Sequence, residues 1–118
     1  MTTEIFVPRV AAWLTTNDRD HWAVRNARTQ TWRRAAWAMS KGNRPFTGPV
    51  TITATIHKPT RVRYDLDGIA PTVKACIDGM CDAGVLTDDH AEVVTTVTIR
   101  AGEPRKRAGI HFIIEETP

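Results

Sequence analysis

Residues 49–84, PVTITATIHKPTRVRYDLDGIAPTVKACIDGMCDAG, decide the fold because their hydrophobic period changes within one continuous stretch. In residues 49–58 apolar and polar side chains alternate, which predicts a strand with one buried face. The residues expected on that face are Val50, Ile52, Ala54 and Ile56. After the basic connection from Pro59 to Arg63, apolar residues recur at helical spacing, so a helix is expected to follow the strand.

The apolar residues of this expected helix form a stripe of Ile69, Val73, Cys76, Ile77 and Met80. Proline is tolerated only in the first turn of a helix, so Pro71 places the helix start near residues 69–70. Gly84 is expected to end the helix. The segment Asp65-Leu66-Asp67 should therefore lie just before its first turn.

On either side of this stretch the sequence predicts three further strands and one further helix. The strands are Glu4–Val10, Glu92–Arg100 and Gly109–Glu116, the last two joined by the basic turn Ala101–Ala108, and the helix runs from an N-cap at Asp20 to about Ser40, closed by Gly42 and Pro45. The order β-α-β-α-β-β predicts an α+β fold, in which two helices pack on one mixed sheet. Residues 1–118 are expected to form a single domain.

The first of these helices should pack on the sheet through one face. That face holds Val24, Thr31, Trp32, Ala35, Ala36 and Met39. Trp22, Trp37 and most of the arginines lie elsewhere around the helix. Trp37 is expected in the core, as aromatic residues in helices usually are, and a contact with a partner or a second copy is the alternative.

The composition, with 42% hydrophobic and 25% charged residues in a chain of 118, is that of an ordinary globular domain. No segment has the length of apolar residues that a membrane span needs, and the first residues do not resemble a signal peptide. A cytoplasmic protein without membrane contacts is therefore expected. Cys76 and Cys81 point in different directions on one helix and lack zinc-site spacing, so both are expected to be free thiols.

The charge is distributed unevenly along the chain, although the net charge is only +3. No acidic residue occurs between Asp20 and Asp65, whereas the charged residues of segment 65–92 are all Asp or Glu apart from Lys74. A basic region that attracts a polyanion, beside an acidic cluster that requires metal ions, is typical of a metal-dependent nuclease. The alternative is that the basic stretch is simply a solvated face. The residues expected to bind DNA phosphates are Arg25, Arg28, Arg33, Arg34, Lys41, Arg44, Arg61 and Arg63.

The acidic segment contains candidate metal ligands. If the chain is extended at Asp65 and Asp67, both carboxylates leave the same side of the backbone, about 7 Å apart. Mg²⁺ binds a few carboxylates together with waters and phosphate oxygens. Asp88 and Asp89, which follow the helix, would supply a third carboxylate. Lys74, seven residues after Asp67, would face the same site and contact a phosphate oxygen.

Each of these residues also has a purely structural interpretation. Asp67 would cap the helix, Asp88 or Asp89 would cap a turn, and Lys74 would pair with Asp78 at i, i+4. His90 is either a general base or, as is more common for a lone histidine beside a strand, a structural residue.

The run Asp65-Leu66-Asp67, Lys74, Asp78 and Gly84-Val-Leu-Thr-Asp88-Asp89 resembles the signature of RusA-type Holliday junction resolvases, found in bacteria and their phages. The match covers about residues 61–97, with weaker similarity at Asn17, Arg19 and Trp22. The resemblance implies a homodimeric endonuclease that makes paired nicks in four-way DNA junctions with Mg²⁺, or Mn²⁺ in its place. It also implies that Asp65, Asp67 and Asp89 are acidic ligands, that Asp88 is their acidic neighbour and that Lys74 is catalytic.

Two positions depart from the usual form of this signature. Gly68 stands where the family commonly has Asn, and Lys74 comes three residues later than in the best-known form. Three residues change the direction of a helical side chain by only about 60°, so Lys74 keeps the same face while moving about 4.5 Å along the axis.

The sequence thus predicts a structure-selective DNA endonuclease that needs no small-molecule cofactor and acts in a bacterial or phage-infected cell. Three alternatives remain open. The first is a non-catalytic nucleic-acid-binding module, the second is a nuclease for flaps, forks or RNA, and the third is a protein-interaction adaptor.

Overall fold

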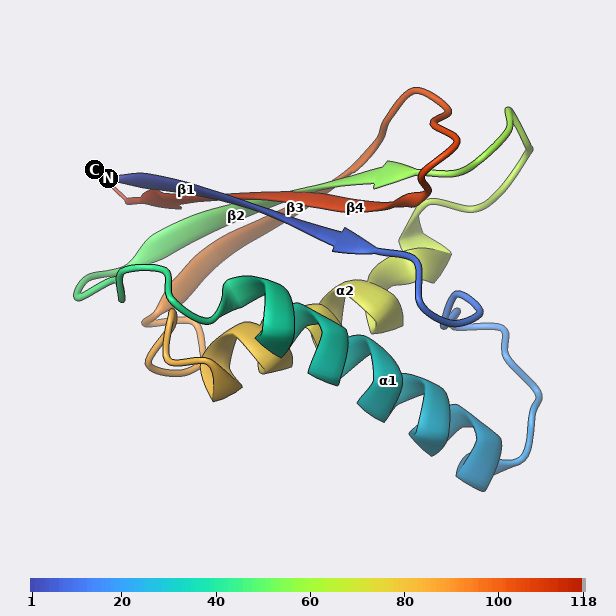
Figure 1. Ribbon diagram of the computed structural model, residues 1–118, viewed down its shortest axis with the longest axis horizontal. Coiled ribbons are helices and arrows are strands. Elements are labelled where there is room, and N and C mark those ends of the chain that lie inside the picture. The colour runs from blue at the N-terminus through green and yellow to red at the C-terminus, as the bar shows by residue number, and fades with distance from the viewer. Residues whose placement is uncertain (118) are drawn as a thin grey trace.

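The computed structural model describes residues 1–117, and its elements follow the predicted order β-α-β-α-β-β (Figure 1). The elements are β1 (Thr2–Pro8), α1 (Trp22–Ser40), β2 (Val50–His57), the 3₁₀ turn η1 (Asp67–Ile69), α2 (Ala70–Asp82), β3 (Val94–Ala101) and β4 (Gly109–Glu116). The predicted bounds of the last strand agree with β4. The predicted strand Glu4–Val10 begins two residues after the start of β1. The predicted strand Glu92–Arg100 begins two residues before the start of β3.

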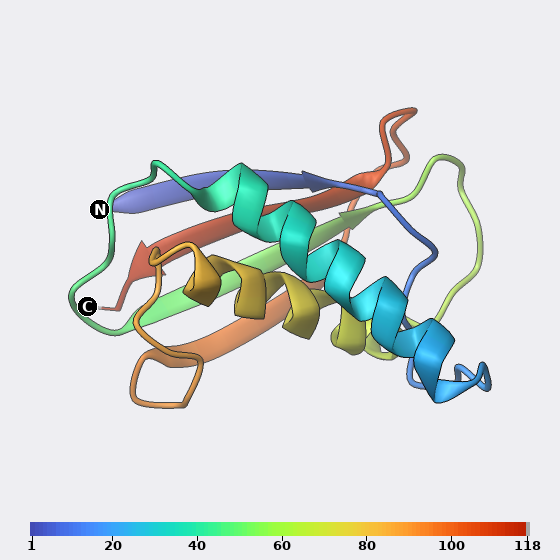
Figure 2. The same ribbon diagram turned by 60° about the horizontal axis from the view of Figure 1, so that its bottom comes forward.

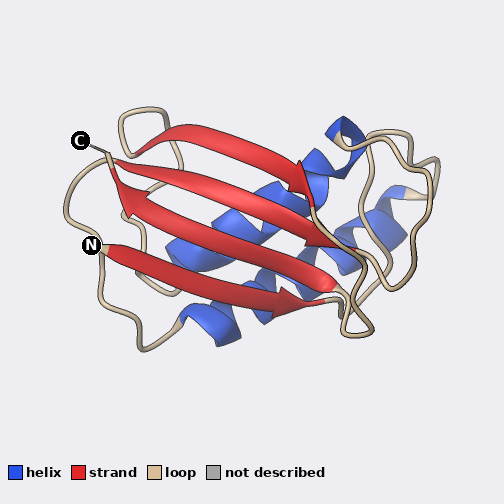
Figure 3. Cartoon of the chain, turned by 90° about the horizontal axis from the view of Figure 1, so that it is seen from above, coloured by secondary structure: helices blue, strands red, loops and turns tan. Residues whose placement is uncertain are grey.

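The four strands form one mixed sheet in the order β1-β4-β2-β3. β4 is antiparallel to both β1 and β2, whereas β2 and β3 are parallel because α2 carries the chain back between them. Both helices lie on one face of the sheet (Figure 2). Figure 3 shows the other face, which neither helix covers. The predicted α+β architecture is therefore confirmed.

The core lies between the sheet and the helices, and its periodicity is the predicted one. The four apolar residues of β2 are buried and its threonines are only half-buried. In β4 the buried residues Ile110, Phe112 and Ile114 stand opposite Ile56, Ala54 and Ile52 of β2. All five members of the predicted α2 stripe are buried, which explains why the sequence located this helix correctly.

The start of α1 differs from the prediction. The N-cap is His21, whose Nδ1 accepts a hydrogen bond from the Ala23 N–H at 3.2 Å. Asp20 instead accepts a hydrogen bond from the Arg28 side chain at 2.5 Å. Asp20 would be a good cap by residue type, but its carboxylate is engaged with a guanidinium and the helix begins one residue later.

The buried face of α1 is narrower than predicted. Its buried residues are Trp32, Ala36 and Ser40, whereas Val24, Thr31 and Met39 are exposed. Trp22 and Trp37 are 73% and 38% exposed, so the expectation that Trp37 belongs to the core was wrong. In Figure 2 α1 lies beside α2, and its N-terminal end extends past the ends of the strands, which accounts for the exposure of Trp22 and Val24 near that end.

The contact between the helices depends on Gly79 of α2. A Cβ atom there would lie 2.2 Å from the carbonyl oxygen of Arg33 and 2.8 Å from the Cβ of Ala36. Only glycine permits the two backbones to approach this closely. Trp32 also holds α1 against the segment between β1 and α1, since its Nε1–H donates to the Ala12 carbonyl at 3.0 Å and its indole stacks on Trp13.

The two cysteines, Cys76 and Cys81, are free thiols, as predicted. Burial raises the pKa of Cys76, and partial burial, with nearby carboxylates, raises the pKa of Cys81 to about 11. Within residues 1–117, neither helix has the combination of length and apolarity that crossing a membrane would require.

Candidate functional site

The turn that carries Asp65 and Asp67 is helical rather than extended. Leu66 has φ −61° and ψ −42°, and the Gly68 N–H donates to the Asp65 carbonyl at 3.1 Å. The expected separation of 7 Å assumed an extended chain and therefore does not apply. The chain turns here because Gly68 and Ile69 are buried and their N–H groups need partners. Both carboxylates remain exposed.

This turn is supported by the segment that connects β1 to α1. The Thr72 hydroxyl accepts from the Leu14 N–H and donates to the Leu14 carbonyl, both at 2.8 Å and both buried. Two residues further on, the Thr16 N–H donates to the Gly68 carbonyl at 3.0 Å. The sequence analysis assigned no role to Thr72. Its signal was a polar residue next to the apolar stripe of α2, which requires a buried partner.

Lys74 lies on the exposed side of α2, where its ammonium contacts two carboxylates. It donates to Asp78 at 2.6 Å, which is the pairing considered from the sequence, and also to Asp89 in the loop after α2. Desolvation lowers the pKa of Lys74, but the hydrogen bonds to these two carboxylates outweigh that effect and raise it. The hydrogen bond from Lys74 lowers the pKa of Asp89 to about 2, with a further contribution from Asp88.

Asp88 and His90 stabilise the loop on either side of Asp89. Asp88 accepts a hydrogen bond from the Asp89 N–H at 2.7 Å, as expected of a residue that caps a turn. His90 Nδ1 accepts from the Glu92 N–H at 3.3 Å, and its Nε2 lies 3.9 Å from Asp88. Both side chains are exposed. Asp88 thus caps a turn and His90 supports the loop before β3, as the structural interpretation of these two residues predicts.

The structure thus brings together Lys74, Asp78 and Asp89, while Asp65 and Asp67 lie before α2. Along the common axis of η1 and the first turn of α2, the backbone position of Lys74 lies about 12 Å beyond that of Asp67 and is rotated by about 40° around this axis. Within residues 1–117, no three His, Cys, Asp or Glu side chains are gathered closely enough to hold one metal ion. Asp65 and Asp67 are exposed and form no ion pair with any residue of 1–117, whereas Asp89 is bound to Lys74.

Several of the predicted DNA-binding residues form contacts within the chain. Arg33 binds Asp82 through two hydrogen bonds of 2.6 and 2.8 Å, which raise the pKa of Arg33 and lower that of Asp82. Arg28 binds Asp20, Arg25 lies 4.0 Å from Asp18, and Lys41 lies 4.4 Å from the centre of the Trp37 ring. In the part of the chain that the structure describes, four exposed candidates have neither an ion pair nor a contact with an aromatic ring. These are Arg34, Arg44, Arg61 and Arg63.

The stretch without acidic residues in the sequence is therefore partly neutralised in space. Asp18 and Asp20 come from just before it and Asp82 from well after it. Comparison with protein-family models found no match, and comparison with curated proteins found no significant match either.

Proposed function

We propose that the protein is a metal-dependent endonuclease for branched DNA, acting as a homodimer on four-way junctions in a bacterial or phage-infected cell. The observation that supports this most is the contact between Lys74 and Asp89. It joins the two separate halves of the RusA-like signature on the exposed side of α2, the helix that Asp67 precedes. Two nicks related by symmetry require two related sites, and for this reason we propose a homodimer. We propose the cytoplasm as its location because the DNA of such a cell lies there.

The exposed residues before α2 fit the requirements of Mg²⁺. This ion prefers oxygen ligands and usually binds one or two carboxylates, several waters and phosphate oxygens of the substrate. Asp65 and Asp67 would hold it, while Asp89, the third predicted carboxylate, is bound to Lys74 and would have to leave that ammonium to join them. The chemistry supplied by a bound Mg²⁺, or Mn²⁺, is the activation of a water and the neutralisation of charge on the scissile phosphate.

Lys74 and Asp89 would supply the charged groups of this site that lie beyond Asp67 along α2. Because the pKa of Asp89 is about 2, its carboxylate is ionised throughout the physiological range. Lys74 has a raised pKa and is therefore protonated, so its ammonium can donate a hydrogen bond to a phosphate oxygen. Asp78, on the same helix, keeps this ammonium oriented along the exposed side of α2.

The arginines without an intramolecular ion pair are the best candidates to bind the DNA backbone. Arg61 and Arg63 lie in the connection that leads to Asp65, so they would bind phosphates close to the cut. Such contacts position the DNA without reading its sequence. Arg28 and Arg33 contribute less, because binding a phosphate would first require them to leave their carboxylate partners.

The decisive experiment compares Asp67→Asn with the wild-type protein on a labelled four-way junction, resolved on a denaturing gel with Mg²⁺. We expect Asp67→Asn to lose cleavage and to keep or strengthen junction binding, since metal affinity and negative charge are removed together. Asp82→Asn, a neutralised aspartate whose partner is Arg33, is the matched control and should still cut. Cleavage by Asp67→Asn at the wild-type rate would show that this site assignment is wrong.

The second candidate function is a DNA-binding module without catalysis. It is favoured by the intramolecular pairing of Lys74 and by the lack, within residues 1–117, of a gathered three-carboxylate set. Such a module would bind DNA without metal and with a steep salt dependence, and would cut nothing in Mg²⁺ or Mn²⁺. Flap, fork and linear duplex substrates in the same assay distinguish a junction enzyme from a nuclease for other branched DNA.

A further inference from the structure

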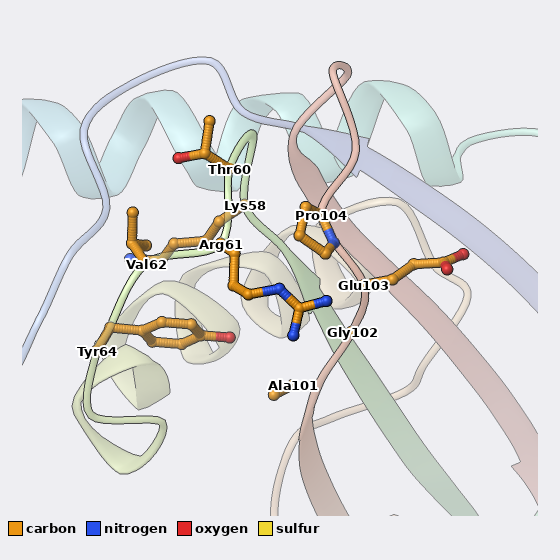
Figure 4. A pocket seen from close by; sticks show the side chains of 9 residues that line it. All are labelled: Lys58, Thr60, Arg61, Val62, Tyr64, Ala101, Gly102, Glu103 and Pro104. Carbon is orange, nitrogen blue, oxygen red and sulfur yellow. The ribbon is translucent and has the colours of Figure 1, made fainter.

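A pocket of about 220 Å³ lies where the parallel strands β2 and β3 both end (Figure 4). One wall is the connection that follows β2, with Lys58, Arg61 and Tyr64, and the other is formed by the end of β3 and residues 102–104. Ligands of α/β proteins commonly bind outside the carboxyl ends of parallel strands. The pocket therefore occupies a favourable position for binding, and Tyr64 joins it directly to Asp65.

The end of β2, which leads into the first wall, is joined to residues 102–103 of the second wall by two hydrogen bonds. The His57 Nδ1–H donates to the Glu103 carbonyl, and the Gly102 N–H donates to the Ile56 carbonyl, each at 2.8 Å. A Cβ atom on Gly102 would lie 2.5 Å from the His57 ring, so the close contact requires glycine. The pocket is thus formed before any ligand binds, which lowers the entropic cost of binding.

The charged groups at this pocket are mainly cationic. The Lys58 ammonium lies 4.2 Å from the centre of the Tyr64 ring and 5.5 Å from that of Trp13. Figure 4 shows the Arg61 side chain beside Tyr64, with the Glu103 carboxylate directed away from its guanidinium. Within residues 1–117, neither Lys58 nor Arg61 forms an ion pair, in contrast to Lys74.

The state of Lys58 indicates that an anion would be favourable here. Partial burial, and then the charge of Arg9, lower the pKa of Lys58. A partly desolvated ammonium near other cations is stabilised when a negative group arrives. Arginine adds a planar set of donors that matches phosphate oxygens.

We infer that the pocket formed by Lys58, Arg61 and Tyr64 binds a phosphate group of the DNA strand, next to the phosphate held at Asp65 and Asp67. The inference rests on the proposed function for the identity of that strand. The volume supports a single phosphate with part of its sugar, since pockets for whole ligands usually measure roughly 300–1,000 Å³. A free phosphate or mononucleotide has the same chemistry, so the experiment must distinguish these sources.

The first test measures junction binding by fluorescence anisotropy at several salt concentrations. Ca²⁺ replaces Mg²⁺ in the buffer, so that the protein binds the junction without cutting it. Lys58→Met keeps the aliphatic stem and removes the charge. We expect its dependence of log K on log salt to be shallower than that of the wild type by about 0.9, the effect of one lost phosphate contact. Lys106→Met, an exposed lysine outside the pocket, removes the same charge and should leave the slope close to that of the wild type.

Arg61→Gln repeats this test at an exposed position where folding is not at risk. If Lys58 and Arg61 bind one phosphate, the double variant should lose less affinity than the product of the two single losses. A wild-type slope for both Lys58→Met and Arg61→Gln would overturn the inference.

The second test is a titration of the ¹⁵N-labelled protein with inorganic phosphate and with dTMP, followed by amide chemical shifts. We expect shifts at Tyr64 and Gly102 in the wild type that are absent in Lys58→Met. Such shifts in a protein that cuts no DNA would refute the nuclease and leave the phosphate site standing. If no shift occurs with either probe and Lys58→Met binds the junction with the wild-type slope, the pocket assignment fails, whether or not the protein is a nuclease.

Discussion

Replacing Gly79 by alanine should force the two helices apart. The new Cβ would lie 2.2 Å from the Arg33 carbonyl oxygen and 2.9 Å from the Trp37 nitrogen, and both of these are backbone atoms. The backbone of α1 would have to move by about 1 Å to reach ordinary contact distance. Overpacking of this kind costs about 1–3 kcal/mol, and the upper value applies because no flexible side chain can yield.

The better helix propensity of alanine offsets about 1 kcal/mol of this cost. The net loss in the free energy of unfolding is therefore about 2 kcal/mol, which lowers the Tm of a chain this size by about 8 °C. Urea unfolding followed by far-ultraviolet circular dichroism measures the loss directly.

Gly68→Ala is the matched control for this substitution. A Cβ there would meet the side chains of Asp65 and Thr16 at 3.7 Å, which is ordinary contact, and its backbone is not in the left-handed region. We expect Gly68→Ala to be about 0.5 kcal/mol more stable than the wild type, because the unfolded chain loses entropy. If Gly79→Ala proves as stable as the wild type or more so, the two helices do not approach as closely as the packing argument requires.

Two further predictions concern the contacts around the candidate site. Lys74→Met should raise the pKa of the Asp89 carboxyl from about 2 toward its ordinary value near 4, as followed by carboxyl NMR; an unchanged value would mean that the two side chains do not meet. Because that pKa is depressed, the contact stabilises the fold above about pH 4 and the effect is lost between about pH 4 and pH 2, with a magnitude below about 1 kcal/mol for exposed groups. Thr72→Val should cost about 2 kcal/mol, because it leaves the buried Leu14 N–H and carbonyl unpaired, and it should speed hydrogen exchange at Leu14. Thr31→Val, on the exposed side of α1, should change stability by less than about 0.5 kcal/mol, and an equal loss in both variants would contradict the role of Thr72.

The elements that sequence predicted well are those whose burial pattern is local. The alternation in β2 and the apolar stripe of α2 each report one buried face, and a buried face repeats with the period of its own backbone. The bounds of β1 were less accurate, because its pairing extends from Thr2 opposite Glu115 to Pro8 opposite Gly109. Where a strand begins depends on its partner, and the strand's own residues contain little information about that partner.

The candidate site shows the same division. The sequence predicted Lys74 within the helix and Asp67 just before its first turn, and in the structure Lys74 lies in α2 and Asp67 begins the preceding turn η1. Asp65-Leu66-Asp67 was expected to be extended, but the buried turn at Gly68 made it helical. The aromatic contacts of Lys58 were missed because they join Trp13, Lys58 and Tyr64, which are neighbours only after the strands have paired.

Local patterns in the sequence were sufficient to predict the order of elements, the buried faces of β2 and α2, and an acidic segment after a basic one. Periodicity and composition carry that information, because they depend on residues close together in the chain. Which charged side chains remain free to bind a ligand could be read only from the folded arrangement of the chain. Arg28 and Arg33 are neutralised by Asp20 and Asp82, while Arg61 is left without an ion pair within residues 1–117. The reason is physical: a salt bridge depends on distance in space, and distance along the chain does not determine it.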